Sequence, residues 1–182
     1  PESLHSIARA GAGVNNIPID KCAEQGIVVF NTPGANANAV KELAIAAMLL
    51  SSRKIVEGIN WAASLTGADV DKQVEKGKAQ FVGPEIQGKI LGVLGLGAIG
   101  VMVSNAATNL SMDVLGYDPY ISVDAAWGLS RAVRKAVDLK TVFENSDFIT
   151  LHMPYNKETK EIINKDSLAQ MKKGVRIINL SR

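Results

Sequence analysis

The chain has 182 residues, of which 47% are hydrophobic and 21% charged, a composition typical of a folded globular protein and too apolar for a disordered one. Lys and Arg total 20 and Asp and Glu 18, a net charge of +2, and basic residues are mostly interleaved with acidic ones, which disfavours nucleic acid and membrane as partners. The single cysteine, Cys22, excludes an internal disulfide and a cysteine-rich zinc site, and it favours a reducing, cytoplasmic location.

The first 33 residues predict a strand, a turn, a helix and a second strand. Leu4 to Ala8 is strand-like, and a glycine turn (AGAG, 10–13) follows it. A short helix between Pro18 and Gly26 and a β-branched run over 27–30 complete a β-α-β unit. Because the chain begins at Pro1 and stops just after another strand-like run, we expect it to be part of a longer protein.

A long helix is predicted from about Asn36 to Lys54. Its apolar residues spread around most of its circumference, which predicts burial on several sides. Its apolar run from Leu43 to Leu50 is eight residues, far short of a membrane span of ~20. Residues 64–88 combine glycines with many charges and predict a surface linker.

From Gly88 onward, β-rich runs alternate regularly with helical segments and show no hairpin signals. This pattern predicts an α/β fold, a doubly wound parallel sheet whose ligands bind at the carboxyl ends of the strands. The expected strands are 89–94, 114–117, one near 133, 148–152 and 175–180, and the expected helices are 99–110 and those starting near 139 and 165.

A glycine-rich loop follows the first of these strands. Residues 95–100 read Gly-Leu-Gly-Ala-Ile-Gly, and the strand before them and the helix after them are the context of a dinucleotide-binding turn. Gly95 allows the tight turn, Gly97 lets a pyrophosphate approach, and Gly100 lets the helix pack closely, while the helix N-terminus supplies N–H groups to the phosphates. A plain glycine turn without a ligand is the alternative.

The next strand ends at Asp118, which is 18 residues beyond Gly100. A carboxylate there can accept hydrogen bonds from both ribose hydroxyls, whereas it would repel a 2′-phosphate. The four residues that follow carry no cation. The expected cofactor is therefore NAD and not NADP; a solvated carboxylate without a ligand is the alternative.

Several blocks of the chain together resemble the NAD-dependent, D-isomer-specific 2-hydroxyacid dehydrogenases. They are ARAGAGVNNI (8–17), NTPGANANAVKELA (31–44), ILGVLGLGAIG (90–100), GYDPYIS (116–122), DFITLHMP (147–154) and KKGVRIINLSR (172–182). The resemblance implies a Rossmann-type cofactor domain with part of a second, flavodoxin-like substrate domain. The implied division is 1–41 partial substrate domain, 42–63 interdomain helix, 64–88 linker and 89–182 incomplete NAD-binding domain.

The resemblance also implies roles for individual residues. Arg182 would be the catalytic arginine, because its guanidinium can bind the substrate carboxylate and polarise the C2 oxygen. The substrate carboxylate would bind backbone N–H groups of Gly11, Ala12 and Gly13, and Arg9 would bind a substrate phosphate. The cofactor would contact the glycine loop, Asp118 and a further set: Ala12, Ala98, Ile99, Met153, Leu180, Ser181 and Arg182. No metal is expected.

The implied reaction is hydride transfer between NAD and a D-2-hydroxyacid, with 3-phospho-D-glycerate, on the route to serine, as the expected substrate. The alternatives are another D-2-hydroxyacid, as in a glyoxylate or hydroxypyruvate reductase, and a non-enzymatic NAD sensor on the same scaffold. The family often has a cation where this chain has Ala98. Its glutamate and histidine acid–base pair would lie beyond Arg182, so the segment alone should be inactive. A homodimer or higher oligomer is the implied assembly.

Overall fold

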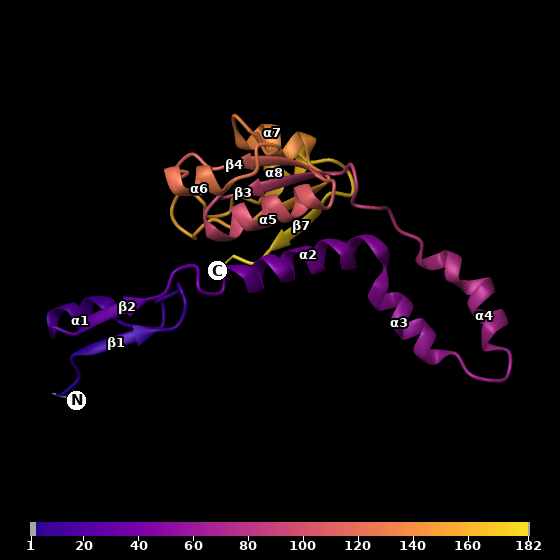
Figure 1. Ribbon diagram of the computed structural model, residues 1–182, viewed down its shortest axis with the longest axis horizontal. Helices are drawn as coiled ribbons and strands as arrows, with labels where there is room; N and C mark the ends of the chain where they lie inside the picture. Colours follow the sequence, from indigo (N-terminus) through magenta and orange to yellow (C-terminus); the bar gives the residue numbers. More distant parts are fainter. Residues whose placement is uncertain (1–2, 182) are drawn as a thin grey trace.

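The computed structural model describes residues 3–181. A β-α-β lobe at the N-terminus, a long helix, a projecting helical arm and a five-stranded α/β unit follow one another along the chain (Figure 1). Within residues 3–181, no helix is both long enough and apolar enough to cross a membrane.

The N-terminal lobe has the predicted β-α-β order. Strands β1 (Ser6–Arg9) and β2 (Val28–Asn31) pair in parallel, with Ser6 opposite Val28, and helix α1 (Ile19–Glu24) connects them. Cys22 is buried on α1, as its small apolar character favours. Phe30 on β2 is 58% exposed, so this pair of strands is covered only in part.

Helix α2 (Ala37–Arg53) connects the lobe to the main sheet. It packs on helix α5 and strand β7 through Ala44 and Met48, both fully buried. Leu43 is 57% exposed and Leu50 43%, so within residues 3–181 the helix is covered on one side and not on the several sides expected. The apolar face away from the sheet has no partner among residues 3–181.

The arm begins where α2 ends. Lys54 has a left-handed backbone (φ +49°), which separates α2 from α3 (Ile55–Ser64). The chain then forms α4 (Val70–Gly77) and the 3₁₀ turn η1 (Lys78–Phe81), so the segment expected to be a linker contains helical structure. Trp61 packs on Phe81, with ring centroids 5.0 Å apart, and a Cβ at Gly77 would collide with the Trp61 ring.

The main sheet is parallel, as the alternating pattern predicts. Its five strands lie in the order β5-β4-β3-β6-β7, an order that was not predicted from the sequence. The central strand β3 (Ile90–Leu94) is almost entirely buried. The other strands are β4 (Asp113–Tyr117), β5 (Arg134–Lys135), β6 (Phe148–Leu151) and β7 (Arg176–Asn179). Leu94 lies opposite both Tyr117 and Leu151, so β3, β4 and β6 end at one edge.

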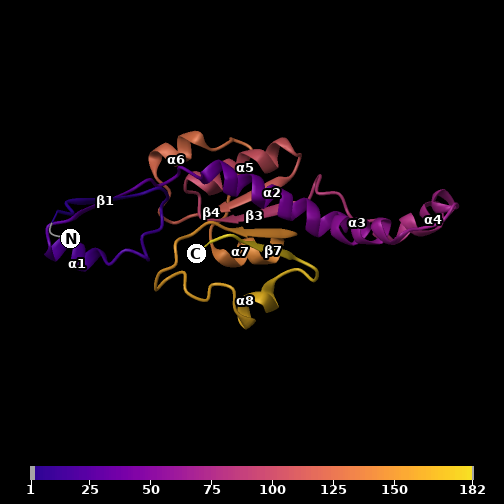
Figure 2. The same ribbon diagram turned by 90° about the horizontal axis from the view of Figure 1, so that it is seen from below.

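Helices cover both faces of this sheet (Figure 2). Helices α2 and α5 (Ala98–Asn109) enclose one core with Leu91, Val93 and Phe148. Helices α7 (Leu139–Asn145) and α8 (Lys165–Gln170) lie on the other face, over a core that includes Val142 and Ile149. Helix α6 (Val123–Gly128) lies beyond β4 and was not anticipated from the sequence.

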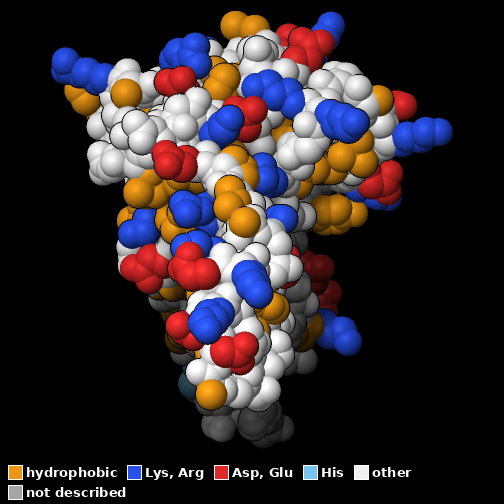
Figure 3. Space-filling model, turned by 90° about the vertical axis from the view of Figure 1, so that its right-hand side faces the viewer, with side chains coloured by type: hydrophobic (Ala, Val, Ile, Leu, Met, Phe, Trp, Pro, Cys, Tyr) orange, Lys and Arg blue, Asp and Glu red, His pale blue; other side chains and the backbone are white. Residues whose placement is uncertain are grey.

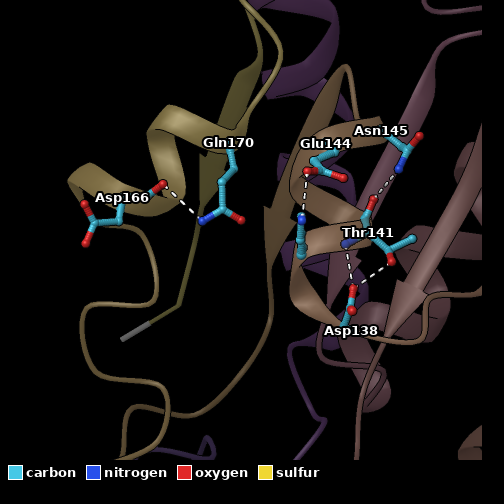
Figure 4. Close-up of polar contacts among 7 residues, drawn as sticks. Asp138, Thr141, Glu144, Asn145, Asp166 and Gln170 are labelled. Carbon is cyan, nitrogen blue, oxygen red and sulfur yellow. Dashed lines mark hydrogen bonds and ion pairs between the residues drawn. The ribbon is translucent and has the colours of Figure 1, made fainter.

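The helices on the second face are held at their ends by local polar contacts (Figure 4). Asp138 caps α7 by accepting hydrogen bonds from the Thr141 amide at 2.7 Å and its hydroxyl at 2.6 Å. These bonds lower the pKa of Asp138 because they favour the charged carboxylate. Asn145 and Gln170 donate to backbone carbonyls within their own helices, so this cluster is structural.

Candidate functional site

The glycine loop forms the turn between β3 and α5. Gly95 has φ +92°, and a Cβ there would lie 2.8 Å from Met153 Cγ and 2.9 Å from the His152 carbonyl oxygen. A Cβ at Gly100 would lie 1.9 Å from the Gly95 carbonyl oxygen. Gly95 therefore serves the tight turn, as predicted, and Gly100 lets α5 pack closely, with the Gly95 carbonyl of the loop nearer to it than Val93 of the strand on which packing was predicted.

Gly97 differs from its two neighbours in the motif. A Cβ built on Gly97 meets no described atom within 4 Å, so the loop surface is open at this residue. Gly97 is the N-cap of α5, and the N–H groups of the first turn, at Ala98, Ile99 and Gly100, have no partners within the helix. The opening therefore lies where backbone donors and the positive end of a 12-residue helix meet.

Asp118 follows β4 directly and lies beside this loop. Its Oδ2 accepts a hydrogen bond of 2.8 Å from the Leu96 amide, and its Oδ1 accepts one of 2.8 Å from the Tyr120 amide. The first bond ties the carboxylate to the glycine loop. Each carboxylate oxygen has lone pairs left for a ligand's hydroxyl groups.

The loop beyond β6 supplies the opposite side of the site. The His152 amide donates to the Leu94 carbonyl at 2.8 Å, which fixes His152 and Met153 beside Gly95. Burial lowers the pKa of His152 from 6.5 to about 4, and its Nε2 lies 3.0 Å from Thr150 Oγ1. His152 is therefore neutral near pH 7 and adds no positive charge to this edge.

Two further hydrogen bonds lie at this edge of the sheet, where the strands end. Tyr120 donates from its hydroxyl to Glu158 Oε2 at 3.2 Å, which links the loops after β4 and β6, and the Glu158 charge raises the pKa of Tyr120. Ser181 donates from its hydroxyl to the Leu151 carbonyl at 2.8 Å. A hollow of about 230 Å³ lies there, lined in part by Met153, Pro154 and Ser181.

The residues predicted to bind substrate lie on a second loop, after β1. Arg9 Nε donates to the Gly13 carbonyl at 3.1 Å, and the Gly11 amide donates to Thr32 Oγ1 at 2.7 Å. The Gly11 N–H is therefore occupied by a protein acceptor. The lobe touches the cofactor side through Gly34, where a Cβ would lie 3.8 Å from Ala98 Cβ.

The structure thus brings most of the predicted cofactor residues to one sheet edge, and it places the loop of residues 10–13 on the adjoining lobe. The predicted catalytic Arg182 lies outside the described residues. Sequence reasoning missed Leu96, Asn31, Thr32, Tyr120 and Glu158. Of these residues, Asn31 and Thr32 could have been found from the sequence, because a polar pair directly after a β-branched run often binds a neighbouring loop.

The open Gly97, the helix N-terminus and the adjacent carboxylate fit a dinucleotide, because a pyrophosphate needs backbone donors without a side chain in the way and a ribose needs an acceptor. Comparison with known families agrees. Residues 45–182 match the model described as "D-isomer specific 2-hydroxyacid dehydrogenase, NAD binding domain".

Similar proteins extend this match to the whole chain. A hydroxypyruvate reductase from Thermotoga maritima is 41% identical over 181 residues, which is 100% of this chain and 54% of the relative. A D-3-phosphoglycerate dehydrogenase from Archaeoglobus fulgidus is 40% identical over 100% of this chain and 32% of its own length. The chain thus spans between about a third and a half of these relatives.

Solved structures give the same result. An apo D-lactate dehydrogenase from Escherichia coli has a TM-score of 0.78 at 34% identity, over 98% of this chain and 52% of that one. A 3-phosphoglycerate dehydrogenase from Entamoeba histolytica with bound NAD⁺ has a TM-score of 0.71 at 31% identity, over 100% of this chain and 50% of that one. The predicted cofactor, NAD, is confirmed for this domain, and the chain belongs to the D-isomer-specific 2-hydroxyacid dehydrogenase family.

Proposed function

We propose that the protein containing this chain transfers a hydride between NAD and a D-2-hydroxyacid. The observation that carries this proposal is the open backbone at Gly97, between the N-terminus of α5 and the carboxylate of Asp118. NAD supplies the hydride acceptor at its nicotinamide ring. The residues of the chain hold and orient the two reactants.

The division of labour follows from the positions of the residues. Ala98, Ile99 and Gly100 would donate to the pyrophosphate, and Asp118 would accept from the ribose. Met153, Leu180 and Ser181 would border the rest of the cofactor. Arg182 would bind the substrate carboxylate and stabilise charge on the C2 oxygen.

Proton transfer needs a base that titrates near neutrality and reaches the C2 hydroxyl. His152 does not meet this requirement, because burial lowers its pKa to about 4 and its Nε2 lies 3.0 Å from Thr150 Oγ1. His5 precedes β1, and its backbone carbonyl accepts a hydrogen bond from the Val28 amide, while its ring has no hydrogen-bond partner among residues 3–181 that would orient it as a base. We therefore assign the proton step to neither histidine.

Within this reaction, 3-phospho-D-glycerate is the substrate we favour. Several similar proteins are named D-3-phosphoglycerate dehydrogenase, and Arg9 lies beside the loop proposed for the substrate. The Arg9 guanidinium has two terminal nitrogens besides Nε, enough for a phosphate. Hydroxypyruvate is the second candidate, because the Thermotoga maritima reductase is as similar as the phosphoglycerate enzymes.

Two further proposals accompany this function. We place the protein in the reducing cytoplasm, because the one cysteine of these 182 residues, Cys22, is a free thiol buried on α1. We also propose that it forms a homodimer or a larger homo-oligomer, because α2 and α3 expose apolar residues that include Leu43, Val56 and Ile59.

The test is an activity assay of the complete gene product with NADH or NAD⁺ and a panel of 2-oxoacids and D-2-hydroxyacids. The highest kcat/KM should be with 3-phospho-D-glycerate or its oxidised form. Arg182→Ala should lower kcat/KM by roughly 10²-fold or more. A protein that binds NADH and turns over no acid in the panel would instead be a sensor on this scaffold.

A further inference from the structure

The loop after β1 is held to the end of β2 through its carbonyl groups. Thr32 donates from its amide to the Gly11 carbonyl at 3.2 Å, and Asn31 Nδ2 donates to the Ala12 carbonyl at 3.0 Å. Arg9 Nε donates to the Gly13 carbonyl at 3.1 Å. Three successive carbonyls of the loop therefore have a protein donor each.

These bonds determine where the amides of the loop point. In a trans peptide the carbonyl of one residue and the N–H of the next point in opposite directions, and the chain has no cis peptide bond among its described residues. A carbonyl turned toward Asn31, Thr32 or Arg9 consequently turns the next amide away from that donor. The amides so oriented belong to Ala12, Gly13 and Val14.

These three amides have no hydrogen-bond acceptor among residues 3–181. The Gly11 amide, in contrast, is used inside the lobe, since it donates to Thr32 Oγ1 at 2.7 Å. Successive backbone N–H groups in a turn form an anion-binding concavity. Gly11 shapes the loop through its backbone conformation, because its φ of +136° is available to glycine and rarely to other residues.

We propose that Asn31, Thr32 and Arg9 are positioning residues that orient the amides of Ala12, Gly13 and Val14 to bind the carboxylate of the substrate. This inference rests on the proposed function, and it changes the set of donors. Val14 replaces Gly11, whose amide is committed to Thr32. Arg9 gains a second role, because its Nε braces the loop while its terminal nitrogens remain for a substrate phosphate.

A positioning role predicts a specific kinetic pattern. A carboxylate bound alike in the ground state and the transition state affects KM and leaves kcat nearly unchanged. Loosening the loop should therefore raise KM for the acid and the inhibition constant of a small dicarboxylate. NADH binding should change less than KM, because most of the expected cofactor contacts lie on the glycine loop and at Asp118, and Ala12 is the one residue of this loop expected to touch the cofactor.

The experiment uses the complete gene product and oxalate as the probe, with the neutral oxamide as its control. Thr32→Val keeps the backbone amide that donates to the Gly11 carbonyl but removes the hydroxyl that accepts from the Gly11 amide, so Gly11 is held on one side of the loop only. Thr32→Ser keeps both bonds. Asn31→Leu removes the side-chain amide that donates to the Ala12 carbonyl and replaces it with a side chain of similar size. Thr108→Val and Asn16→Leu are the matched controls, since Thr108 bonds within α5 and Asn16 is exposed outside this set of bonds.

We expect Thr32→Val and Asn31→Leu each to raise the inhibition constant of oxalate and KM about tenfold, the effect of one well-placed hydrogen bond. Thr32→Ser and both controls should stay within about twofold by the same scale. Amide hydrogen exchange provides a readout without turnover. Oxalate, but not oxamide, should slow exchange in a peptide covering residues 10–17, and this protection should weaken in Thr32→Val and Asn31→Leu.

The outcomes separate this inference from the proposed function. Unchanged oxalate constants in both variants of an active dehydrogenase would overturn the positioning role and leave the function standing. A wild-type protein inactive on every acid would overturn the function, while oxalate protection of residues 10–17 would still support the anion site. If Thr32→Val does not fold, Asn31→Leu and Thr32→Ser decide the question.

Discussion

Asp118 has two tasks at the scale of a single residue. The sequence predicts its place at a strand end and its use as a ribose acceptor. The structure adds that Oδ2 already accepts a hydrogen bond of 2.8 Å from the Leu96 amide of the glycine loop. A backbone contact of this kind leaves no mark in the sequence, because any residue at 96 except proline could supply the same N–H.

We predict that Asp118→Ala weakens NADH by about 10- to 100-fold, because it removes a ribose acceptor and a bond to the loop, each on the order of 1 kcal/mol or more. The affinity for NADPH should fall less, because the substitution also removes the repulsion between the carboxylate and the 2′-phosphate. Calorimetric dissociation constants for both cofactors test this. Asp113→Ala, at the opposite, exposed end of β4, is the matched control, and an unchanged ratio of the two cofactor affinities would contradict the role.

The burial of His152 makes folding stability depend on pH. Its pKa is lowered to about 4 because burial disfavours the charged ring. His152 takes up a proton near pH 6.5 in the unfolded chain and only near pH 4 in the folded chain. The contribution of the neutral ring to folding stability is therefore fully present above pH 6.5 and is lost as the pH falls toward 4.

We predict that His152→Gln reduces this acid loss. The free energy of unfolding in denaturant, measured at pH 7 and pH 5, should fall less in the variant, by on the order of 1 kcal/mol after allowance for the exposed part of the ring. His5→Gln controls for the loss of a histidine. Equal acid losses in wild-type and His152→Gln protein would show that His152 is not the group responsible.

At the scale of elements, the periodic and glycine-marked segments were predictable, and the segments held by tertiary contacts were not. Helix α5 and its loop follow the glycine pattern because Gly95 and Gly100 each meet backbone or side-chain atoms that exclude a Cβ. Helix α4 escaped prediction because half of residues 70–77 are charged and only two are large and apolar, which leaves no clear helical period. Its place in the arm depends on the contact between Gly77 and Trp61.

Substitution by alanine should affect two glycines of the loop differently: Gly100→Ala should lower stability, and Gly97→Ala should lower NADH affinity. Gly100→Ala places a methyl 1.9 Å from the Gly95 carbonyl oxygen, so it should destabilise the fold by roughly 2–4 kcal/mol. Gly97→Ala meets no described atom within 4 Å, so stability should be kept. The added methyl would still occupy the approach to the pyrophosphate, and NADH affinity should drop at least about tenfold, the 1.4 kcal/mol of one lost contact.

Thermal unfolding and NADH titration of both variants test this pair. Gly174→Ala, at a turn where a Cβ also meets no atom within 4 Å but φ is +83°, separates backbone strain from obstruction. It should lose some stability and keep NADH affinity. Normal NADH binding by Gly97→Ala would show that the opening is not the phosphate site.

At the scale of the molecule, the sequence predicted a doubly wound parallel sheet with the candidate site at the carboxyl ends of its strands, because parallel strands separated by helices allow few topologies. The order of the strands was not predicted. The surface was harder to predict. An apolar residue on a helix can face a core or a partner, and the sequence does not tell which. The outer face of α2 shows this, with Leu43 and Leu50 at 57% and 43% exposure.

The exposed apolar surface of α2 continues onto helix α3 of the arm. Helices α3 and α4 project away from the sheet (Figure 1), and the side that faces the viewer in Figure 3 mixes basic, acidic and apolar side chains without a region of one charge. Such a surface disfavours a polyanion as its partner. The exposed apolar residues of α2 and α3 fit a second copy of the chain, which would bring an equal apolar surface around a two-fold axis.

We therefore predict that the complete gene product sediments as a dimer or larger assembly at micromolar concentration. Ile59, which is 61% exposed on α3, is the residue to change. Ile59→Asp would bury a carboxylate in each copy of a symmetric contact, a cost of several kcal/mol, and should raise the dissociation constant of the dimer by roughly 10²-fold or more. Val137→Asp, at a still more exposed position (81%) near β5, is the matched control and should leave assembly unchanged. A wild-type monomer at these concentrations, or an Ile59→Asp variant that assembles as well as the wild type, would assign the exposed face of the arm to another role.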